Sequence, residues 1–222
     1  MDDIMRAQTV YFNIGPFEVN ETIVALWVVS LIMLVGGFLL TRGKFSWLPK
    51  GRQNAIETLV ESIDSFVGFV MGDERRFFTP FIGTLMVLLL LCNTAGLWSF
   101  GLLRPPTADI NMTLGLGLIS FFLINGYAIK SHGLGGYLKG FVSPFFLLLP
   151  MNVFGELAKP ISLGVRLFGN IFSGLVIGGL IYSAFPFLVP IPIHIYFDLF
   201  SGVLQTAVFS ILTMVFIAMA MD

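Results

Sequence analysis

The stretch that decides the fold covers residues 145–185 and has the sequence FFLLLPMNVFGELAKPISLGVRLFGNIFSGLVIGGLIYSAF. Its 41 residues carry three charges, which belong to Glu156, Lys159 and Arg166. A straight α-helix of this length would extend for about 60 Å, which is twice the thickness of the hydrocarbon core of a bilayer. Because Pro150 and Pro160 break or kink a helix, the stretch predicts strongly tilted helices inside a membrane.

The composition of the whole chain supports a membrane location. Of its 222 residues, 56% are hydrophobic and 11% are charged, and the mean hydropathy is +0.92. These values are typical of an integral membrane protein rather than a soluble domain. The formal net charge of -1 offers no basic field for nucleic acid. A single cysteine, Cys92, excludes a disulfide within the chain, and no cysteine metal site is expected.

The first span and the orientation follow from the distribution of charge near the N-terminus. Residues 22–41 form an uncharged run of 20 residues, long enough to cross a bilayer. Four basic residues follow within a short segment: Arg42, Lys44, Lys50 and Arg52. The positive-inside rule assigns this cluster to the cytoplasmic face, so the N-terminus is predicted to lie outside.

The remaining elements complete an all-α integral membrane fold in a single membrane domain. Residues 52–71 have apolar positions at helical spacing opposite acidic ones, which predicts an amphipathic helix on the cytoplasmic surface. Further spans are predicted at 77–99 and 112–129, with an outer loop between them and a cytoplasmic loop carrying Lys130 and Lys139 after the second. We therefore expect about five membrane-inserted helices plus one amphipathic surface helix. The last two, at 145–185 and 194–221, are expected to be long and strongly tilted.

Two polar stripes occur in the last two helices. In the first, residues recur at intervals of three and four: Lys159, Ser162, Arg166, Asn170 and Ser173. In the second, the same spacing relates His194, Asp198, Ser201 and Gln205. Ionisable groups at membrane depth on two adjacent helices indicate a buried ion path better than a packing seam.

Arg166 is the decisive residue of these stripes. An arginine at the bilayer centre costs about 2.5–3.5 kcal/mol on insertion scales, and it cannot escape that cost by losing its proton. A salt bridge with Asp198, snorkelling to an interface, or an anionic partner on another protein would compensate it. Asp198 can change protonation state, so it is a candidate proton carrier. His194, one turn away, is either a relay or an interfacial cap.

The motif at 159–170, KPISLGVRLFGN, resembles the signature of the a subunit of F-type ATP synthases, in which this arginine faces a ring of c subunits. The outer-loop run 106–113, PTADINMT, which contains Asp109 and Asn111, resembles a second motif of the family. The pattern around Gln205 is similar to the family's last helix. The resemblance covers nearly the whole chain.

The resemblance implies a role for each matching residue. Arg166 would be the essential arginine, Asn170 and Gln205 its polar neighbours, and Asp198 the ionisable group of the outer half-channel. The other candidates for ion translocation come from the spacing of the two polar stripes and not from the resemblance: Ser173, Ser201, His194 and Lys159. One departure is Leu175, where many members have a glutamate nine residues after the arginine. A second is Asn93 and Gly96, where some members have an aspartate.

The implied function is ion translocation in the stator of a rotary ATP synthase. Two offset half-channels would load and unload carboxylates of the c ring and couple a flow of protons or sodium ions to rotation. The implied partners are the c ring, the peripheral-stalk b subunits, the rest of the synthase and membrane lipid. No cofactor or nucleic acid is expected, and a bacterial plasma membrane is favoured over an organellar one.

Two other classes of protein stay open on the residues alone. The chain has no GxxxxGK[ST] loop for nucleotide phosphates, so we expect no ATPase activity from it alone. A stand-alone secondary transporter would bind solute at broken helices, but no second half repeats the pattern around Arg166. A structural membrane anchor would use the polar stripes as glue between helices. The sequence does not distinguish protons from sodium ions.

Overall fold

The structure, a computed structural model, describes residues 10–14, 17–42, 51–99, 104–142, 145–184 and 195–221. The elements, in chain order, are β1 (Val10–Ile14), β2 (Phe17–Asn20), α1 (Glu21–Thr41), α2 (Arg52–Met71), the 3₁₀ helix η1 (Asp73–Phe78), α3 (Thr79–Asn93), α4 (Ala95–Trp98), the 3₁₀ helix η2 (Pro106–Ala108), α5 (Ile110–Val142), the 3₁₀ helix η3 (Phe146–Leu148), α6 (Leu149–Ala184), the π-helix η4 (Ile195–Ser201) and α8 (Gly202–Met221). The predicted positions Lys44, Lys50, His194 and the Pro-rich turn at 186–192 lie outside the described residues.

The prediction of an all-α membrane protein is confirmed. Within the described residues, five helical segments are long and apolar enough to cross a membrane: Glu21–Thr41, Asp73–Asn93, Ile110–Val142, Phe146–Ile181 and Leu199–Met221. The only strands in that part of the chain are β1 and β2, which pair antiparallel just before α1 and were not predicted.

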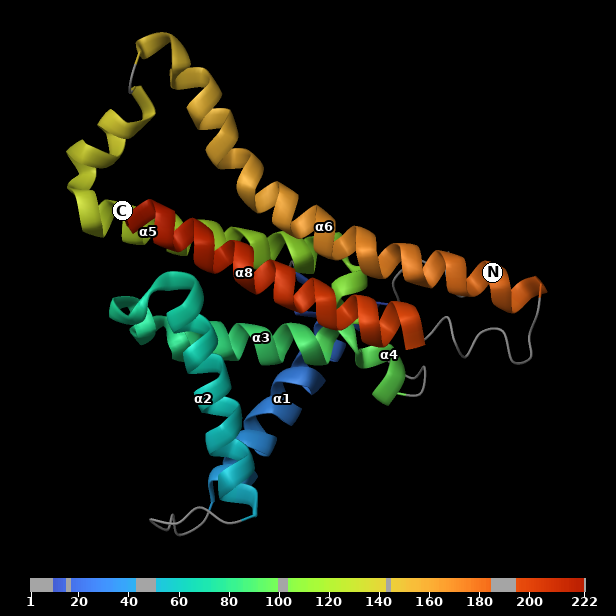
Figure 1. The fold of residues 1–222 in the computed structure, drawn as a ribbon. Coiled ribbons are helices and arrows are strands. Elements are labelled where there is room, and N and C mark those ends of the chain that lie inside the picture. Colours follow the sequence, from blue (N-terminus) through green and yellow to red (C-terminus); the bar gives the residue numbers. More distant parts are fainter. Residues whose placement is uncertain are drawn as a thin grey trace.

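Helix α8 packs against both α3 and α5 at the centre of the bundle, and α6 crosses α5 (Figure 1). One core cluster joins α2, α3, α5 and α8 and includes Val67, Ile82, Ile124 and Met214. A second cluster brings in α6 through Leu163 and Leu167, which pack with Phe209 of α8. Away from this core, α1 and the first half of α2 extend to the bottom of the view.

Helix α5 is longer than predicted. The sequence predicts a span that ends at residue 129, followed by a loop. The first helical segment of α5 instead continues to a kink at Gly133, whose backbone angles (φ 69°, ψ 163°) are not helical, and a second helical segment then extends to Val142. Lys130 lies on the first segment and Lys139 on the second. Tertiary packing of the second half of α5 against α6 has overridden the weak helix propensity of its glycines.

Helix α6 contains Pro160 and nevertheless runs as one helix, with a change of direction part-way along its length (Figure 1). It crosses α5 at two glycines, where backbone meets backbone. A Cβ added to Gly117 would lie 2.5 Å from the carbonyl oxygen of Pro160, and one added to Gly164 would lie 3.0 Å from that of Thr113. This crossing fixes the position of α6 on the bundle.

A charged network attaches α2 to the start of α3. Arg76 pairs with Asp64 and Asp73, and Thr79 Oγ1 donates to Asp64 Oδ1 at 2.7 Å. The hydrogen bond from Thr79 and then the one from Arg76 lower the pKa of Asp64 below its ordinary value of 3.8. The helix bounds of α2 match the predicted 52–71, while its place on a membrane surface stays a prediction.

Candidate ion-translocation site

Arg166 lies on the outward face of α6. Leu163 and Leu167 on the adjacent side of the helix are buried, with 2% and 0% of their surface exposed, and this fixes the rotation of the helix. Ser162, Arg166 and Ser173 are exposed as a result. Among the side chains that the structure describes, none forms a hydrogen bond or an ion pair with the Arg166 guanidinium. The charge therefore faces away from its own bundle, where another subunit can reach it.

Asn170 and Gln205 meet between the two predicted polar stripes. Asn170 Nδ2 donates to Gln205 Oε1 at 3.2 Å, and Gln205 has 4% of its surface exposed. Asn170 lies one turn after Arg166, so the contact links the arginine's helix to α8 at nearly the same level.

Asn93 extends this contact to a third helix and was missed as a site residue from the sequence. Its Nδ2 donates to Thr206 Oγ1 at 3.1 Å and to the carbonyl oxygen of Gly202 at 3.2 Å. Asn93 is 1% exposed and its Oδ1 is buried without a hydrogen-bond partner. We call Asn170, Gln205, Thr206 and Asn93 the amide layer, since it crosses α6, α8 and α3. Asn93 stood out in the sequence only as a departure from the family pattern.

A second polar face of α8 continues inward from the amide layer. Ser210 and Thr213 follow Thr206 at intervals of four and three, and Ser120 of α5 is also fully buried. Their hydroxyl oxygens have no partner within the described part of the chain. Buried polar groups of this kind are normally paired with protein or bound water. The intervals between Thr206, Ser210 and Thr213 can be read from the sequence, but the predicted polar stripe of this helix was the one on the adjacent face, through Gln205.

Lys159 differs from Arg166 because it has partners. Its Nζ lies 2.7 Å from Glu156 Oε2 and 5.3 Å from the centre of the Phe216 ring on α8. Both members of the ion pair are half-buried, with side-chain exposures of 31% for Lys159 and 19% for Glu156. The predicted stripe on α6 thus has one paired and one unpaired cation.

Asp198 lies in the π-helix η4, and its side chain is outside what the structure describes. Ser201, at the end of η4, is half-buried. The backbone of η4 packs closely on α6, because a Cβ added to Gly174 would lie 2.9 Å from Cβ of Phe197. A π-helical turn is rare and often occurs at functional sites. A salt bridge between Arg166 and Asp198 stays an open alternative.

The outer-loop motif forms the start of α5. Asp109 is buried, and its Oδ1 accepts a hydrogen bond of 2.8 Å from the backbone N–H of Asn111. The preceding η2 is buried too, with Thr107 at 0% exposure. Asp109 therefore satisfies a free backbone donor at the first turn of α5. In the described residues, no group of three His, Cys, Asp or Glu side chains could hold a metal ion.

Comparison with known proteins identifies the family. Residues 23–218 match the family described as ATP synthase A chain. The chain belongs to this family. It is 36% identical to the "ATP synthase subunit a, sodium ion specific" of Propionigenium modestum, over 98% of this chain and 79% of that protein. It is 34% identical to the ATP synthase subunit a of Moorella thermoacetica, over 93% of each chain.

Membership of the ATP synthase A chain family also gives the general function. The chain is an ion-translocating stator subunit of an F-type ATP synthase and a multi-pass membrane protein. It works as one component of that multisubunit complex.

Proposed function

We propose that the chain carries ions through two offset half-channels that meet at Arg166 and exchange ions with carboxylates on a ring of c subunits. The observation that carries this proposal is the exposed guanidinium of Arg166, which has no partner among the described side chains. A fixed charge at this depth favours the ionised form of a carboxylate that passes it. The ring carboxylate therefore releases its ion on approach and takes up another after it has passed.

The surroundings of Arg166 support a separating role. The amide layer begins at Asn170, four residues after Arg166, which is about 6 Å along the helix axis. The ion pair of Lys159 and Glu156 lies before Arg166, beginning about 10 Å away. Polar groups thus occur on both sides of the arginine along α6. A cation between them opposes direct passage of a positive ion from one side to the other.

Family membership supports the proposed partners and location. The c ring would face the exposed side of α6, and the peripheral-stalk b subunits would contact the chain elsewhere. ATP chemistry would belong to other subunits, with this chain contributing no catalytic group. A bacterial plasma membrane is the proposed location. Each elementary charge that crosses contributes about 2.3 kcal/mol per 100 mV, so several must pass for each ATP.

The test is to replace Arg166 in the assembled complex and reconstitute it in vesicles. Arg166→Ala should abolish ATP synthesis driven by an ion gradient, while passive ion flux through the membrane sector persists or rises. Arg166→Lys should give little or no synthesis, since lysine lacks the planar five-donor head. Arg42→Ala removes an exposed arginine at the end of α1 and should leave coupling intact. Substantial synthesis by Arg166→Ala would refute the proposal.

The coupling ion is tested with the same vesicles. The Propionigenium modestum relative is named as sodium ion specific, and that name is a reason to test sodium first. ATP-driven ion uptake is measured with and without added sodium. Uptake that requires sodium and persists with a protonophore indicates sodium, while uptake that needs no sodium and collapses with the protonophore indicates protons.

The proposed orientation has the N-terminus outside and the C-terminus in the cytoplasm. The outer loop is an obvious place for a cysteine label, but Thr107 is fully buried. Ile110, which is 41% exposed at the start of α5, is a better position. A cysteine at Ile110 should react with an impermeant thiol reagent only from the outer side. Reaction only from the cytoplasm would invert the topology.

A further inference from the structure

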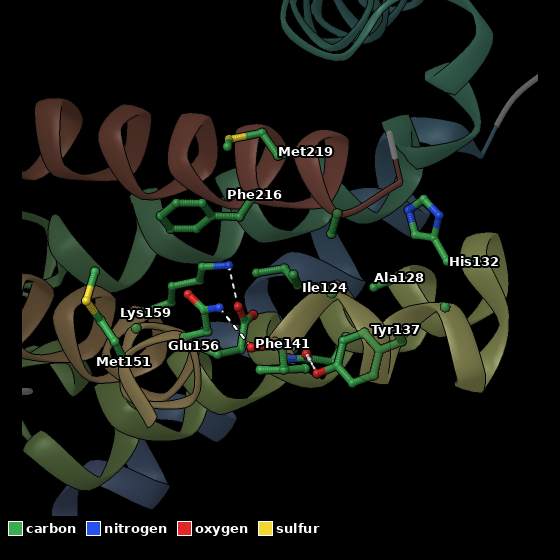
Figure 2. Close-up of a pocket in the computed structure, with 16 residues that line it drawn as sticks. Ile124, Ala128, His132, Tyr137, Phe141, Met151, Glu156, Lys159, Phe216 and Met219 are labelled. Atoms are coloured by element: carbon green, nitrogen blue, oxygen red, sulfur yellow. Dashed lines mark hydrogen bonds and ion pairs between the residues drawn. The ribbon is translucent and has the colours of Figure 1, made fainter. Parts of the chain in front are cut away.

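A cavity of about 780 Å³ opens at the end of the bundle where α8 finishes and α5 bends. Figure 2 shows Phe216 and Met219 of α8 on one side of it and Tyr137 of α5 on another, with the side chains of Glu156 and Lys159 between them. The amide layer contributes none of the lining residues. The cavity is therefore a separate compartment from the polar layer after Arg166.

The ion pair in this cavity is poorly explained as a structural contact. Exposed and buried ion pairs alike contribute little net stability, and well-packed apolar residues often serve as well as this half-buried pair would. Glu156 is the only carboxylate among the described residues that line the cavity. The ammonium of Lys159 lies 2.7 Å from the Glu156 carboxylate and 5.3 Å from the centre of the Phe216 ring. When Glu156 is protonated and neutral, the ammonium still has a favourable cation–π contact with Phe216.

The position of the cavity relative to Arg166 gives the pair a role. Glu156 lies ten residues before Arg166, about 15 Å along α6, and the amide layer lies on the far side of the arginine. In the proposed topology the C-terminus is cytoplasmic, so the cavity opens to the cytoplasm. The cavity is open and has polar side chains on its α6 side. Its lining residue nearest to Arg166 on α6 is Lys159, about two helical turns before the arginine.

We infer that this cavity is the cytoplasmic ion vestibule and that Glu156 is the carboxylate in it that exchanges the coupling ion with the ring. The inference rests on the proposed function. If the ion is a proton, the O–H bond of the ring carboxyl breaks and one forms on a Glu156 oxygen, with water in the vestibule carrying the proton between them. Water in the vestibule then takes that proton as hydronium and leaves the carboxylate. If the ion is sodium, the carboxylate replaces water ligands and no covalent bond changes.

Lys159 is a positioning residue in this scheme. It orients the Glu156 carboxylate toward the cavity and favours its ionised form between transfers. Two other titratable groups face the cavity, His132 and Tyr137, both on α5. Tyr137 donates its hydroxyl to Asn125 Oδ1. The described lining residues of α8 are all apolar. A pH profile measured on the cytoplasmic side must be interpreted with these groups in view.

The experiment compares Glu156→Gln with the double variant Glu156→Gln/Lys159→Met in the assembled complex. Passive ion flux and ATP-driven uptake are recorded in inverted vesicles over a range of cytoplasmic-side pH, with and without sodium. Both variants should lower flux about tenfold or more, and should flatten its dependence on pH or on sodium, whichever ion is carried. The matched control is Glu61→Gln on exposed α2, which should behave as wild type.

The double variant separates ion exchange from structure. If Glu156 only neutralises Lys159, removing both charges restores flux, and that result overturns the inference. If Glu156→Gln alone does not assemble, the double variant carries the test, because it leaves no lone charge buried. Normal flux in it overturns the inference, and slow flux supports it. Arg166→Ala is measured in parallel. If this variant still couples ion flow to ATP synthesis, the proposed function is wrong. If it is uncoupled while both Glu156 variants have normal flux, only the assignment of the vestibule is wrong.

Discussion

Replacing Gly117 by alanine should push α6 away from α5. The new Cβ would lie 2.5 Å from the carbonyl oxygen of Pro160. The closest favourable carbon–oxygen contacts between helices are about 3.3 Å, so the two backbones must separate by about 0.8 Å. Because the obstructing atom belongs to the backbone, no change of rotamer can relieve the clash. Overpacking of this kind costs about 1–3 kcal/mol.

The displacement matters because Pro160 and Arg166 share one helix. Moving α6 by nearly 1 Å moves the guanidinium relative to whatever it faces. Misplacement by about 1 Å can lower the rate of a positioned reaction by about 10²-fold. We therefore expect Gly117→Ala to lower ATP-driven ion uptake by about tenfold or more, in complexes that still assemble and still hydrolyse ATP.

A control on the same helix isolates the contact. A Cβ added to Gly115 meets no atom within 4 Å. Gly115→Ala should leave uptake unchanged and stabilise α5 by up to about 0.5–1 kcal/mol, because alanine favours a helix over glycine. Thermal unfolding of the complex and uptake in vesicles are measured for both variants. Equal unfolding temperatures and equal uptake would refute the close crossing of α5 and α6.

Three further predictions concern acidic residues. Asp198→Asn should slow ion entry from the outer side in an assembled complex, because an amide cannot titrate; normal turnover with an unchanged pH profile would count against it. Asp109→Ala should lower the free energy of unfolding by about 0.5–2 kcal/mol through loss of the cap on α5, as measured by thermal unfolding. Asp64 has a lowered pKa, so its contribution to docking α2 is present above its ordinary value of 3.8 and is lost as the pH falls through its folded pKa. Proteolysis of α2 should accordingly not change between pH 5 and 8, and a change in that range would contradict the assignment.

Sequence periodicity was sufficient to predict the bounds of two kinds of helix: those with one apolar and one polar face, and those that are apolar all round. The bounds 52–71 of α2 match because its apolar positions alternate with acidic ones at helical spacing. The first span was predicted at 22–41 and is observed at Glu21–Thr41, where an uncharged run ends at Arg42.

Features that depend on contacts between distant segments were beyond that analysis. The second half of α5 contains Gly133, Gly135, Gly136 and Gly140, a composition that predicts a loop, and packing on α6 makes it a helix. The partner of Asn93 is Thr206, 113 residues away, and no local pattern connects the two. The ion pair of Glu156 and Lys159 was visible at a spacing of three, but the cavity around it exists only once α8 closes over α6.

An arginine that faces outward from its own bundle sets an energetic condition on any rotary partner. Placing Arg166 in the hydrocarbon core costs about 2.5–3.5 kcal/mol or more. A ring that brings a carboxylate to the guanidinium would offset this cost, which the described side chains of the chain itself do not offset. A carboxylate at about 4 Å gains about 4 kcal/mol at an effective dielectric constant of 20, before its own desolvation is subtracted. In the proposed mechanism, the net attraction that remains after desolvation has to be of the same order as the roughly 2.3 kcal/mol that one charge gains per 100 mV. An attraction of that size would hold the carboxylate ionised as it passes and would still let the ion gradient pull it away again. A tighter pair would stop the ring, and an internally paired arginine would lose the ability to discharge it.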